Sequence, residues 1–499
     1  MGPVEGILFG FSVALQWQNL MGCFFGVLIG TVVGVLPGIG PVGAMALLLP
    51  VTLSMTPAGA LIMLSGIYYG SMYGGSTTAI LLKIPGEVAS VVTTLDGYKM
   101  AQRGRAGAAL FVAAIGSFVA GTVGVIGLAF VGPMLSKAAL NFGPPEFLAL
   151  CLLGLMILSR LTGSSLTRSF IMVAAGLALS TIGMDPMSGT SRFTFGFLEL
   201  SQGIDLVPVA MGMFGVAELL VMAESALKQQ KPIPVRIREL LPTREEWQRS
   251  RFPIARGSVM GFLFGLIPGP TALIATFTSY TLERKLSKHP EQFGQGAIEG
   301  VAGPEAANNG AAQGAFIPLL TLGIPFAPAS ALLLTALLVH GVQTGPLMMV
   351  NSPDIFWGVV SSMYVGNFML LVLNLPLIGI FVSLLRLPIH HIASVVALLC
   401  VVGTYAISNS MLDIWTLLIS GVVSFLLRKL RFEPAILVLA LALGTILERS
   451  LIQSLYLVQG EWTQIFMRPI TAGMLAVGVL VLVVPTLVDR WSRRNRLAQ

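Results

Sequence analysis

Charged residues are scarce in this sequence: only 10% of its 499 residues are charged, whereas roughly 25% are charged in soluble domains. Hydrophobic residues make up 55% of the chain, and the mean hydropathy is +0.86. This composition excludes a soluble globular domain and indicates a polytopic membrane protein in contact with the lipid bilayer. Glycine is abundant instead, at 56 residues, as expected where membrane helices pack closely.

Cysteine and histidine are also rare, with three and four residues. Cys23, Cys151 and Cys400 lie far apart in apolar stretches, so their spacing predicts neither a disulfide framework nor a metal site. The sequence contains no H-E-x-x-H motif and no G-K-[ST] phosphate-binding loop. We therefore expect no enzyme, no cofactor and no metal beyond a sodium ion. Without a nucleotide-binding motif, any energy-driven step would depend on an ion gradient or on a separate ATPase.

Positive charge is missing from the start of the chain, since no Lys or Arg precedes Lys83. The net charge of +7 comes from short basic runs between apolar segments and from the C-terminal tail. Runs in such places mark the cytoplasmic side of a membrane protein and do not favour binding to nucleic acid. With the loop at 83–105 and the C-terminus in the cytoplasm, the basic residues left outside are Lys137, Arg192, Arg449 and Arg468.

Long apolar segments predict an all-α fold with about 12 membrane segments, because about 20 residues cross a bilayer as a helix. Plain spans are expected near 106–130, 144–159, 169–183, 206–227, 356–385, 388–408, 412–427, 434–447 and 469–488. Two segments, 20–53 and 257–282, are interrupted by glycine and proline and are expected to be re-entrant hairpins. Basic runs flank 257–282 at both ends but do not follow 20–53, so the hairpins would enter from opposite faces.

The two halves of the chain also resemble each other. A shift of 240 residues superposes Gly74 on Gly314, and a shift of 231 superposes Pro37 on Pro268. Inverted repeats with interrupted segments at matching positions predict a secondary transporter whose substrate site lies near the middle of the membrane. The expected units are a first repeat with following helices at 1–227, a cytoplasmic amphipathic linker at 228–256, a second inverted repeat with following helices at 257–488 and a basic cytoplasmic tail at 489–499.

Polar residues gather at interruptions in the apolar segments, at 37–41, 73–78, 268–271 and 304–313. Irregular backbone at membrane depth is stable only where it is buried in protein or lines a watery cavity. The ends of such broken helices offer N–H groups to carboxylates and carbonyl groups to cations. The expected substrate site comprises Pro37, Gly38, Ile39, Gly40, Ser71, Gly74, Gly75, Ser76, Thr77, Thr78, Pro268, Gly269, Thr271, Asn308, Asn309 and Gln313.

An ion site is expected around Glu305, which follows Pro304 in an otherwise apolar segment. An ionisable residue at membrane depth is by default a functional candidate. The expected ion ligands are Glu305, Asn309, Thr78 and Thr321. The alternative is that the glycines and prolines here only kink the helices and allow them to pack closely.

These same segments resemble a known family. The motifs are G-V-L-P-G-I-G-P at 34–41, Y-G-S-M-Y-G-G-S-T-T-A-I-L-L-K-I-P-G at 69–86, D-G-Y-K-M-A-Q-R-G at 96–104 and G-P-E-A-A-N-N-G-A-A-Q-G at 303–314. They are similar to the large membrane subunit of tripartite tricarboxylate transporters, the TctA family, over nearly the whole chain. Lys83 departs from the pattern, because a neutral polar residue such as Asn is expected there.

The resemblance implies a symporter in the bacterial inner membrane. It implies import of tricarboxylates or related dicarboxylates, citrate-like, delivered by a periplasmic solute-binding protein. The implied partner is a small membrane subunit with about four spans, and the implied driving force is a gradient of sodium ions, with protons as the alternative. The competing interpretations are a passive carboxylate or anion channel and, more distantly, an intramembrane hydrolase, for which Ser76 has no evident base.

Overall fold

The computed structural model describes residues 1–36, 40–161, 165–185, 188–224, 233, 240–384 and 389–497. Most of these residues are helical, and β1 (Gly183–Met184) pairs antiparallel with β2 (Ser191–Arg192). The predicted class of helical membrane protein is confirmed, because 5 helices of the described part are long and apolar enough to cross a membrane. These are Trp17–Val35, Ala106–Ala139, Pro353–Asn374, Met411–Lys429 and Pro434–Leu457.

The helices fall into a first half, α1–α10, and a second half, α11–α23. The first half begins with α1 (Pro3–Ala14), α2 (Trp17–Val35), α3 (Gly40–Thr52), α4 (Pro57–Leu82), η1 (Val88–Val91), α5 (Thr93–Gln102) and α6 (Ala106–Ala139). It continues with α7 (Pro144–Leu161), α8 (Leu166–Ser180), η2 (Glu199–Gln202), α9 (Leu206–Ala210), the π-helix η3 (Met211–Val216) and α10 (Ala217–Glu224). The second half begins with α11 (Arg244–Gly265), α12 (Thr271–Leu286), η5 (Pro290–Gln292), α13 (Glu299–Gly314), α14 (Phe316–Leu322), α15 (Pro328–Val339), α16 (Met348–Asn351) and α17 (Pro353–Asn374). It ends with α18 (Ile378–Leu384), α19 (Ile389–Ser408), α20 (Met411–Lys429), α21 (Pro434–Leu457), α22 (Trp462–Met467) and α23 (Pro469–Leu497).

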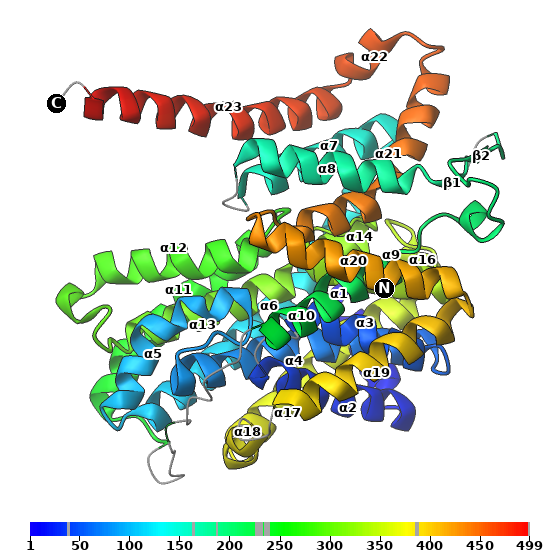
Figure 1. Ribbon diagram of the computed structural model, residues 1–499. Coiled ribbons are helices and arrows are strands. Elements are labelled where there is room, and N and C mark those ends of the chain that lie inside the picture. The colour runs from blue at the N-terminus through cyan, green and yellow to red at the C-terminus, as the bar shows by residue number, and fades with distance from the viewer. Residues whose placement is uncertain are drawn as a thin grey trace.

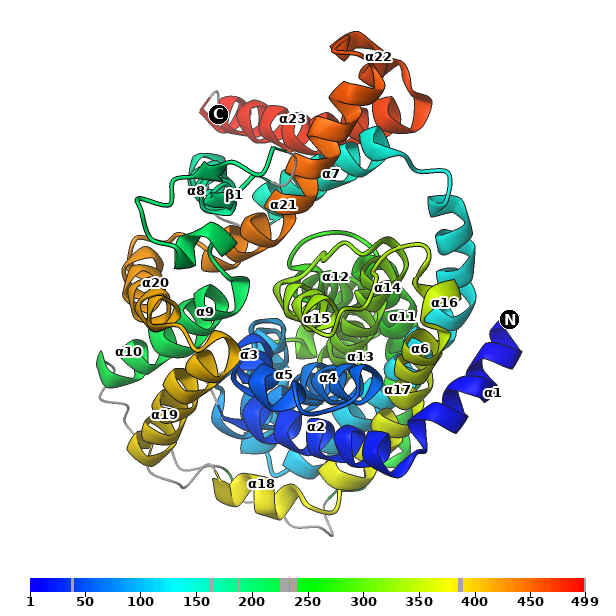
Figure 2. The same cartoon turned by 90° about the vertical axis from the view of Figure 1, so that its right-hand side faces the viewer.

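The helices that carry the four glycine- and proline-containing motifs lie together in the middle of the molecule. Figure 2 shows α2–α5 and α11–α15 gathered at the centre, with α8–α10 and α18–α21 around them. In Figure 1 α23, drawn in red, lies at the edge, where it packs against α7. The first and second halves therefore share one central body, and the remaining helices cover it.

A stripe of glycines brings α2 into direct backbone contact with α4. A Cβ atom on Gly30 would lie only 2.5 Å from the carbonyl oxygen of Ile67. The same holds one helical turn to either side, where Gly26 faces Met63 and Gly34 faces Ser71 at 2.3 and 2.2 Å. No other residue leaves room for two backbones at this separation, as in other small-residue helix interfaces of membranes.

The pair α11 and α13 repeats this contact. Cβ atoms on Gly257, Gly261 and Gly265 would lie 2.3, 2.2 and 2.5 Å from carbonyl oxygens of α13. Each of these glycines is the counterpart of a glycine on α2 under the shift of 231 residues. Their partners on α13, Gly303, Ala307 and Ala311, are the counterparts of the partners on α4 under the shift of 240. The resemblance between the two halves is thus a resemblance of packing as well as of sequence.

The helices α4 and α14 also end in the same way. Lys83 after α4 and Gly323 after α14 adopt left-handed conformations, with φ of 59° and 70°. The amide of Ile84 donates to the carbonyl oxygen of Thr78 at 3.4 Å, and the residue after Gly323 makes the corresponding bond at 3.4 Å. Glycine or asparagine is the usual residue at such a position. Lys83 therefore occupies a backbone site for which its side chain is poorly suited.

Two of the four predicted interruptions are wrong. The helix α4 runs through 73–78 without a break, and α13 runs through 304–313. The reason is that the glycines there serve close packing: a Cβ on Gly74 would lie 2.3 Å from the carbonyl oxygen of Thr31. The other two interruptions do separate helices, at the end of α2 and at 266–270.

Other predicted boundaries also shift. The helix α11 begins at Arg244, inside the predicted linker, much of which lies outside the described residues. The predicted span at 356–385 is divided, because α17 ends at Asn374 and the following residues lead into Pro376. Pro376 has no backbone N–H to donate to the carbonyl of Val372, which explains the stop.

An apolar face of α20 points away from the protein. Trp415 is 61% exposed and Ile419 59%, and Val422 and Leu426 continue the same stripe. Large apolar side chains at i, i+4, i+7 and i+11 on an outer helix are suited to lipid. This exposed stripe agrees with the membrane assignment.

Candidate functional site

Glu305 lies where the two halves of the chain meet. Its side chain projects from α13 and is fully buried. The hydroxyl group of Ser76 on α4 donates a hydrogen bond to one carboxyl oxygen, and the hydroxyl group of Thr93 on α5 donates to the other. The structure thus brings a predicted ion ligand, Glu305, into direct contact with a predicted substrate residue, Ser76.

A second carboxyl group, that of Glu87, is half-buried and lies beside Asn308. The amide nitrogen of Asn308, one turn along α13 from Glu305, donates to Oε1 of Glu87 at 2.8 Å. The other oxygen of Glu87 accepts from the backbone amide of Ala89 at 2.7 Å, which fixes Glu87 at the start of η1. The Oδ1 atom of Asn308 is buried and has no hydrogen-bond partner among the described residues.

The next residue, Asn309, points toward α6. Its amide donates to the hydroxyl oxygen of Ser117 at 2.7 Å and to the backbone carbonyl of Glu305 at 3.1 Å. Farther along α4, the hydroxyl of Tyr73 donates to Asn367 on α17 at 2.9 Å. These bonds extend a polar layer across the otherwise apolar centre of the protein. Apart from the carboxyl groups, it consists of neutral amides and hydroxyls.

The space beside this layer is small. A cavity of about 10 Å³ is lined by Tyr73, Ser76, Thr77, Ser117 and Asn374, among others. That is about the room one water molecule needs. A larger, open hollow of about 520 Å³ runs along α11, but it is lined by apolar side chains and Arg256 and lies away from the polar layer. A carboxylate the size of citrate does not fit beside Ser76 in this conformation.

Several predicted site residues have only local partners. The hydroxyl groups of Ser71, Thr78 and Thr321 each donate to a backbone carbonyl of their own helix, at 2.7, 3.2 and 2.7 Å. Gln313 is buried against Gly124 of α6, and its Oε1 atom has no partner among the described residues. The structure therefore does not gather Thr78 and Thr321 around Glu305.

The last turn of α2 and the turn at 266–270 each approach the loop that follows the central helix of the same half. The amide of Gly269 donates to the carbonyl oxygen of Phe326 at 2.9 Å, and Thr271 then begins α12. In the first half the carbonyl of Gly34 lies close to Gly86. Gly40 begins α3 with φ of 63°, whereas the predicted site residues Pro37, Gly38 and Ile39 lie outside the described residues.

Sequence reasoning missed Glu87, Thr93 and Ser117. Glu87 and Thr93 belong to the loop after α4, which the basic residues around it mark as cytoplasmic. One signal could have identified Glu87: an acidic residue directly after P-G, followed three residues later by Ser90, is a capping pattern that ties its side chain to the backbone. Nothing in the sequence shows that η1 and α5 fold against α13.

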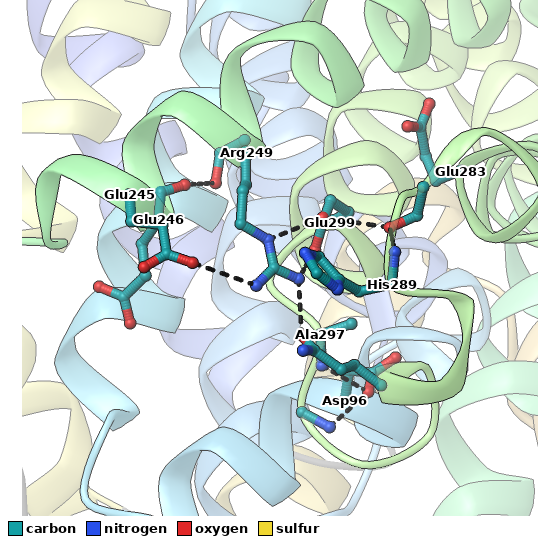
Figure 3. Close-up of polar contacts among 12 residues, drawn as sticks. Asp96, Glu245, Glu246, Arg249, Glu283, His289, Ala297 and Glu299 are labelled. Atoms are coloured by element: carbon teal, nitrogen blue, oxygen red, sulfur yellow. Dashed lines mark hydrogen bonds and ion pairs between the residues drawn. The ribbon is translucent and has the colours of Figure 1, made fainter.

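A cluster of ion pairs and hydrogen bonds joins the two halves at the end of the molecule that holds the basic loops. Asp96 on α5 accepts hydrogen bonds from the backbone amides of Gly296 and Ala297 at 2.6 and 2.9 Å, just before α13 begins. Arg249 on α11 pairs with Glu299 through two bonds of 2.9 and 2.8 Å. Figure 3 shows Asp96 beside Ala297 and the Arg249 side chain directed at Glu299. The N-terminus of the helix that carries Glu305 is therefore tied to both halves.

Glu246 near the start of α11 completes this connection. Burial alone would raise the pKa of its carboxyl group, but hydrogen bonds from the Arg105 guanidinium and from Thr243 hold the pKa below its ordinary value. Glu246 therefore stays ionised near neutral pH and links the start of α6 to α11.

Comparison with known proteins gives a consistent result. The chain matches the model described as the "Tripartite tricarboxylate transporter TctA family" over residues 20–439. An uncharacterized 52.8 kDa protein in the TAR-I ttuC' 3' region of Agrobacterium vitis is 44% identical over 497 residues, which cover 100% of this chain and 99% of that protein. An uncharacterized protein in the TAR-II ttuC' 3' region of the same organism is 40% identical over 237 residues, 48% of this chain and 98% of that protein. No solved structure matches the chain.

Proposed function

The chain belongs to the tripartite tricarboxylate transporter TctA family, and we propose that it is the membrane subunit through which a citrate-like tricarboxylate, or a related dicarboxylate, enters the cell. TctA is a transporter family and not a family of enzymes. In this proposal a periplasmic solute-binding protein delivers the substrate, and a small second membrane subunit completes the carrier. Uptake is driven by an inward gradient of sodium ions.

The observation that carries the proposal is the polar junction between the halves. Glu305 of the second half accepts hydrogen bonds from Ser76 and Thr93 of the first half, in the centre of an apolar body. Among the described residues, no basic side chain forms an ion pair with Glu305 at this junction. Buried polar groups at the meeting point of two repeats are the arrangement that secondary transporters use to bind substrate and coupling ion.

The packing of the halves supports an alternating mechanism. The pairs α2/α4 and α11/α13 repeat one glycine contact, and the basic runs of the sequence suggest that the repeats have opposite orientations in the membrane. In this proposal the protein lies in the bacterial inner membrane with its C-terminus in the cytoplasm. The small cavity beside Ser76 would then belong to a closed conformation, and substrate would enter when the two halves move relative to each other.

The decisive experiment is uptake of labelled carboxylates into vesicles that contain this chain and its small membrane partner. A panel of di- and tricarboxylates, beginning with citrate, is offered with and without the periplasmic binding protein and an inward sodium gradient. We expect one of them to accumulate only when both are present. Downhill flux that is indifferent to both would contradict the proposal and indicate a passive anion channel.

A further inference from the structure

Two carboxyl groups, one from each half, lie beside Asn308 or one turn from it without a basic partner; Glu305 is fully buried and Glu87 is half-buried. Asn308, one turn along α13 from Glu305, donates a hydrogen bond to Glu87, which places both carboxyl groups at the same junction. Among the described residues neither forms an ion pair with Lys, Arg or His. Two other buried carboxylates are paired with arginine, Glu283 with Arg256 and Glu146 with Arg468. Burying an unpaired charge is costly, so this pair needs a positive partner that the chain does not supply.

We propose that Glu87 and Asn308, together with Glu305, bind one sodium ion between the two halves. The inference rests on the proposed ion-driven carrier and specifies where its coupling ion sits. It replaces Thr78 and Thr321, whose hydroxyls bond to their own helices, with Glu87 and Asn308 as ligands.

The unpartnered oxygen of Asn308 points to a ligand independently of the acidic pair. The Nδ2 atom of Asn308 donates to Glu87 at 2.8 Å, so the Oδ1 atom on the same amide lies beside that carboxyl group. This oxygen is completely buried and accepts no hydrogen bond from the described residues. Buried amide oxygens are nearly always satisfied, and a cation would satisfy this one.

The ligand chemistry favours a hard cation, and the proposed sodium-driven carrier makes sodium the ion to test. The available atoms are carboxyl, hydroxyl and amide oxygens, which suit ions such as sodium. Both oxygens of Glu305 already accept hydrogen bonds, from Ser76 and Thr93, and both oxygens of Glu87 accept hydrogen bonds as well. The buried Oδ1 atom of Asn308 is therefore the unsatisfied oxygen among these three side chains. Within the described residues no group of three or more His, Cys, Asp or Glu side chains gathers, so a transition-metal centre does not fit.

The position of the site gives the ion a mechanical role. Glu87 begins η1 in the first half, whereas Asn308 and Glu305 lie on α13 in the second half. An ion bound by both would hold the loop after α4 against α13. Its release would leave two like charges at the same junction and would favour separation of these elements.

The first test is thermal unfolding of the purified full-length chain with its small partner. Unfolding is followed in NaCl, KCl or choline chloride at equal ionic strength. Because a ligand that binds only the folded state stabilises it, we expect Tm to rise with NaCl and to saturate, with no comparable rise in the other salts. In Glu87→Gln and Glu305→Gln the sodium-dependent rise should be lost, and in Asn308→Ala it should need at least about tenfold more sodium, the shift that loss of one good ligand produces.

The matched control is Glu245→Gln, which removes a carboxylate that is 79% exposed on α11. It should keep the full response to sodium. A glutamate variant that does not fold leaves two tests of the sodium site. These are the wild-type response to sodium and the response of Asn308→Ala, which keeps both carboxyl groups. A wild-type Tm that responds equally to all three salts, or an unchanged sodium response in Glu87→Gln, would overturn the site.

The same variants separate this inference from the proposed carrier. If wild-type protein binds sodium and Glu87→Gln does not, but no carboxylate accumulates in vesicles, the site stands and the transport proposal fails. If sodium-driven accumulation survives in Glu87→Gln, the carrier stands and the site assignment fails.

Discussion

Lys83 holds a backbone conformation that costs energy for a residue with a Cβ atom. Its φ of 59° lies in the left-handed region, and its counterpart in the second half is Gly323. The left-handed conformation costs about 1–2 kcal/mol for an ordinary L-residue. The side chain is exposed, so it returns little of this cost through contacts.

We therefore expect Lys83→Gly to stabilise the protein by up to about 1 kcal/mol, since part of the gain is offset by the greater freedom of glycine in the unfolded chain. The measurement is thermal unfolding of the purified protein. Lys83→Ala is the control, because it removes the charge and keeps the Cβ atom, and it should give no gain. Equal gains in both variants would show that the charge, and not the backbone, is responsible.

At the same scale, the sequence identifies part of the candidate site. Glu305 and Ser76 are both predicted because a carboxyl group and a hydroxyl group stand out in apolar segments. Thr93 and Glu87 are not, because their residue types are ordinary in a loop and only the folding of that loop against α13 brings them to Glu305 and Asn308. Local sequence carries no information on such contacts, which join residues more than two hundred positions apart.

At the scale of elements, the glycine stripes decide how closely the central helices approach. On α2 a Cβ at Gly30 would meet the backbone of Ile67, and on α11 a Cβ at Gly261 would meet that of Ala307. A backbone atom cannot move aside as a flexible side chain can. The two contacts are equivalent by sequence position and should respond alike.

Gly30→Ala and Gly261→Ala should each destabilise the protein by about 1–3 kcal/mol, the usual cost of overpacking a close-packed interface. The measurement is the loss of Tm together with the yield of monodisperse protein. Gly473→Ala on α23 is the matched control: nothing lies within 4 Å of the added Cβ, so the substitution should be neutral or slightly stabilising. A loss of stability in only one of the first two variants would contradict the equivalence of the helix pairs.

The element scale also shows why some sequence predictions are wrong. A cluster of glycines and hydroxyls, as at 73–78, has the same composition whether a helix breaks there or packs tightly against a neighbour. Proline next to glycine distinguishes the cases better: Pro268 and Pro270 do end a helix, because proline lacks the N–H that a continuing helix needs. Pro304 is an exception, since α13 continues through it.

At the scale of the whole molecule, the membership in a transporter family is predicted from the sequence and confirmed, whereas the orientation of the chain remains a prediction. The predicted orientation depends only on the positions of the basic residues, because an apolar helix can cross the membrane equally well in either direction. The structure shows that the orientation can be tested by cysteine labelling. The native cysteines Cys23, Cys151 and Cys400 are all buried, so they give a low background for thiol labelling.

We expect a cysteine at Ser188, beside the β1–β2 hairpin, to react with a membrane-impermeant maleimide added to intact cells whose outer membrane is permeabilised. A cysteine at Glu291, whose side chain is 67% exposed near the start of α13, should react only after the inner membrane is opened. Both positions are exposed, so a difference in labelling reports the side of the membrane. The reverse pattern would show that the chain is inserted the other way round.

The cavity of about 10 Å³ beside Ser76 has a consequence for the energetics of the cell. A space that admits about one water molecule cannot conduct a hydrated ion. A hydrated ion therefore has no room to pass beside Ser76 in this conformation. If uptake is coupled to an ion gradient, as proposed, this conformation preserves the gradient for the other processes that draw on it.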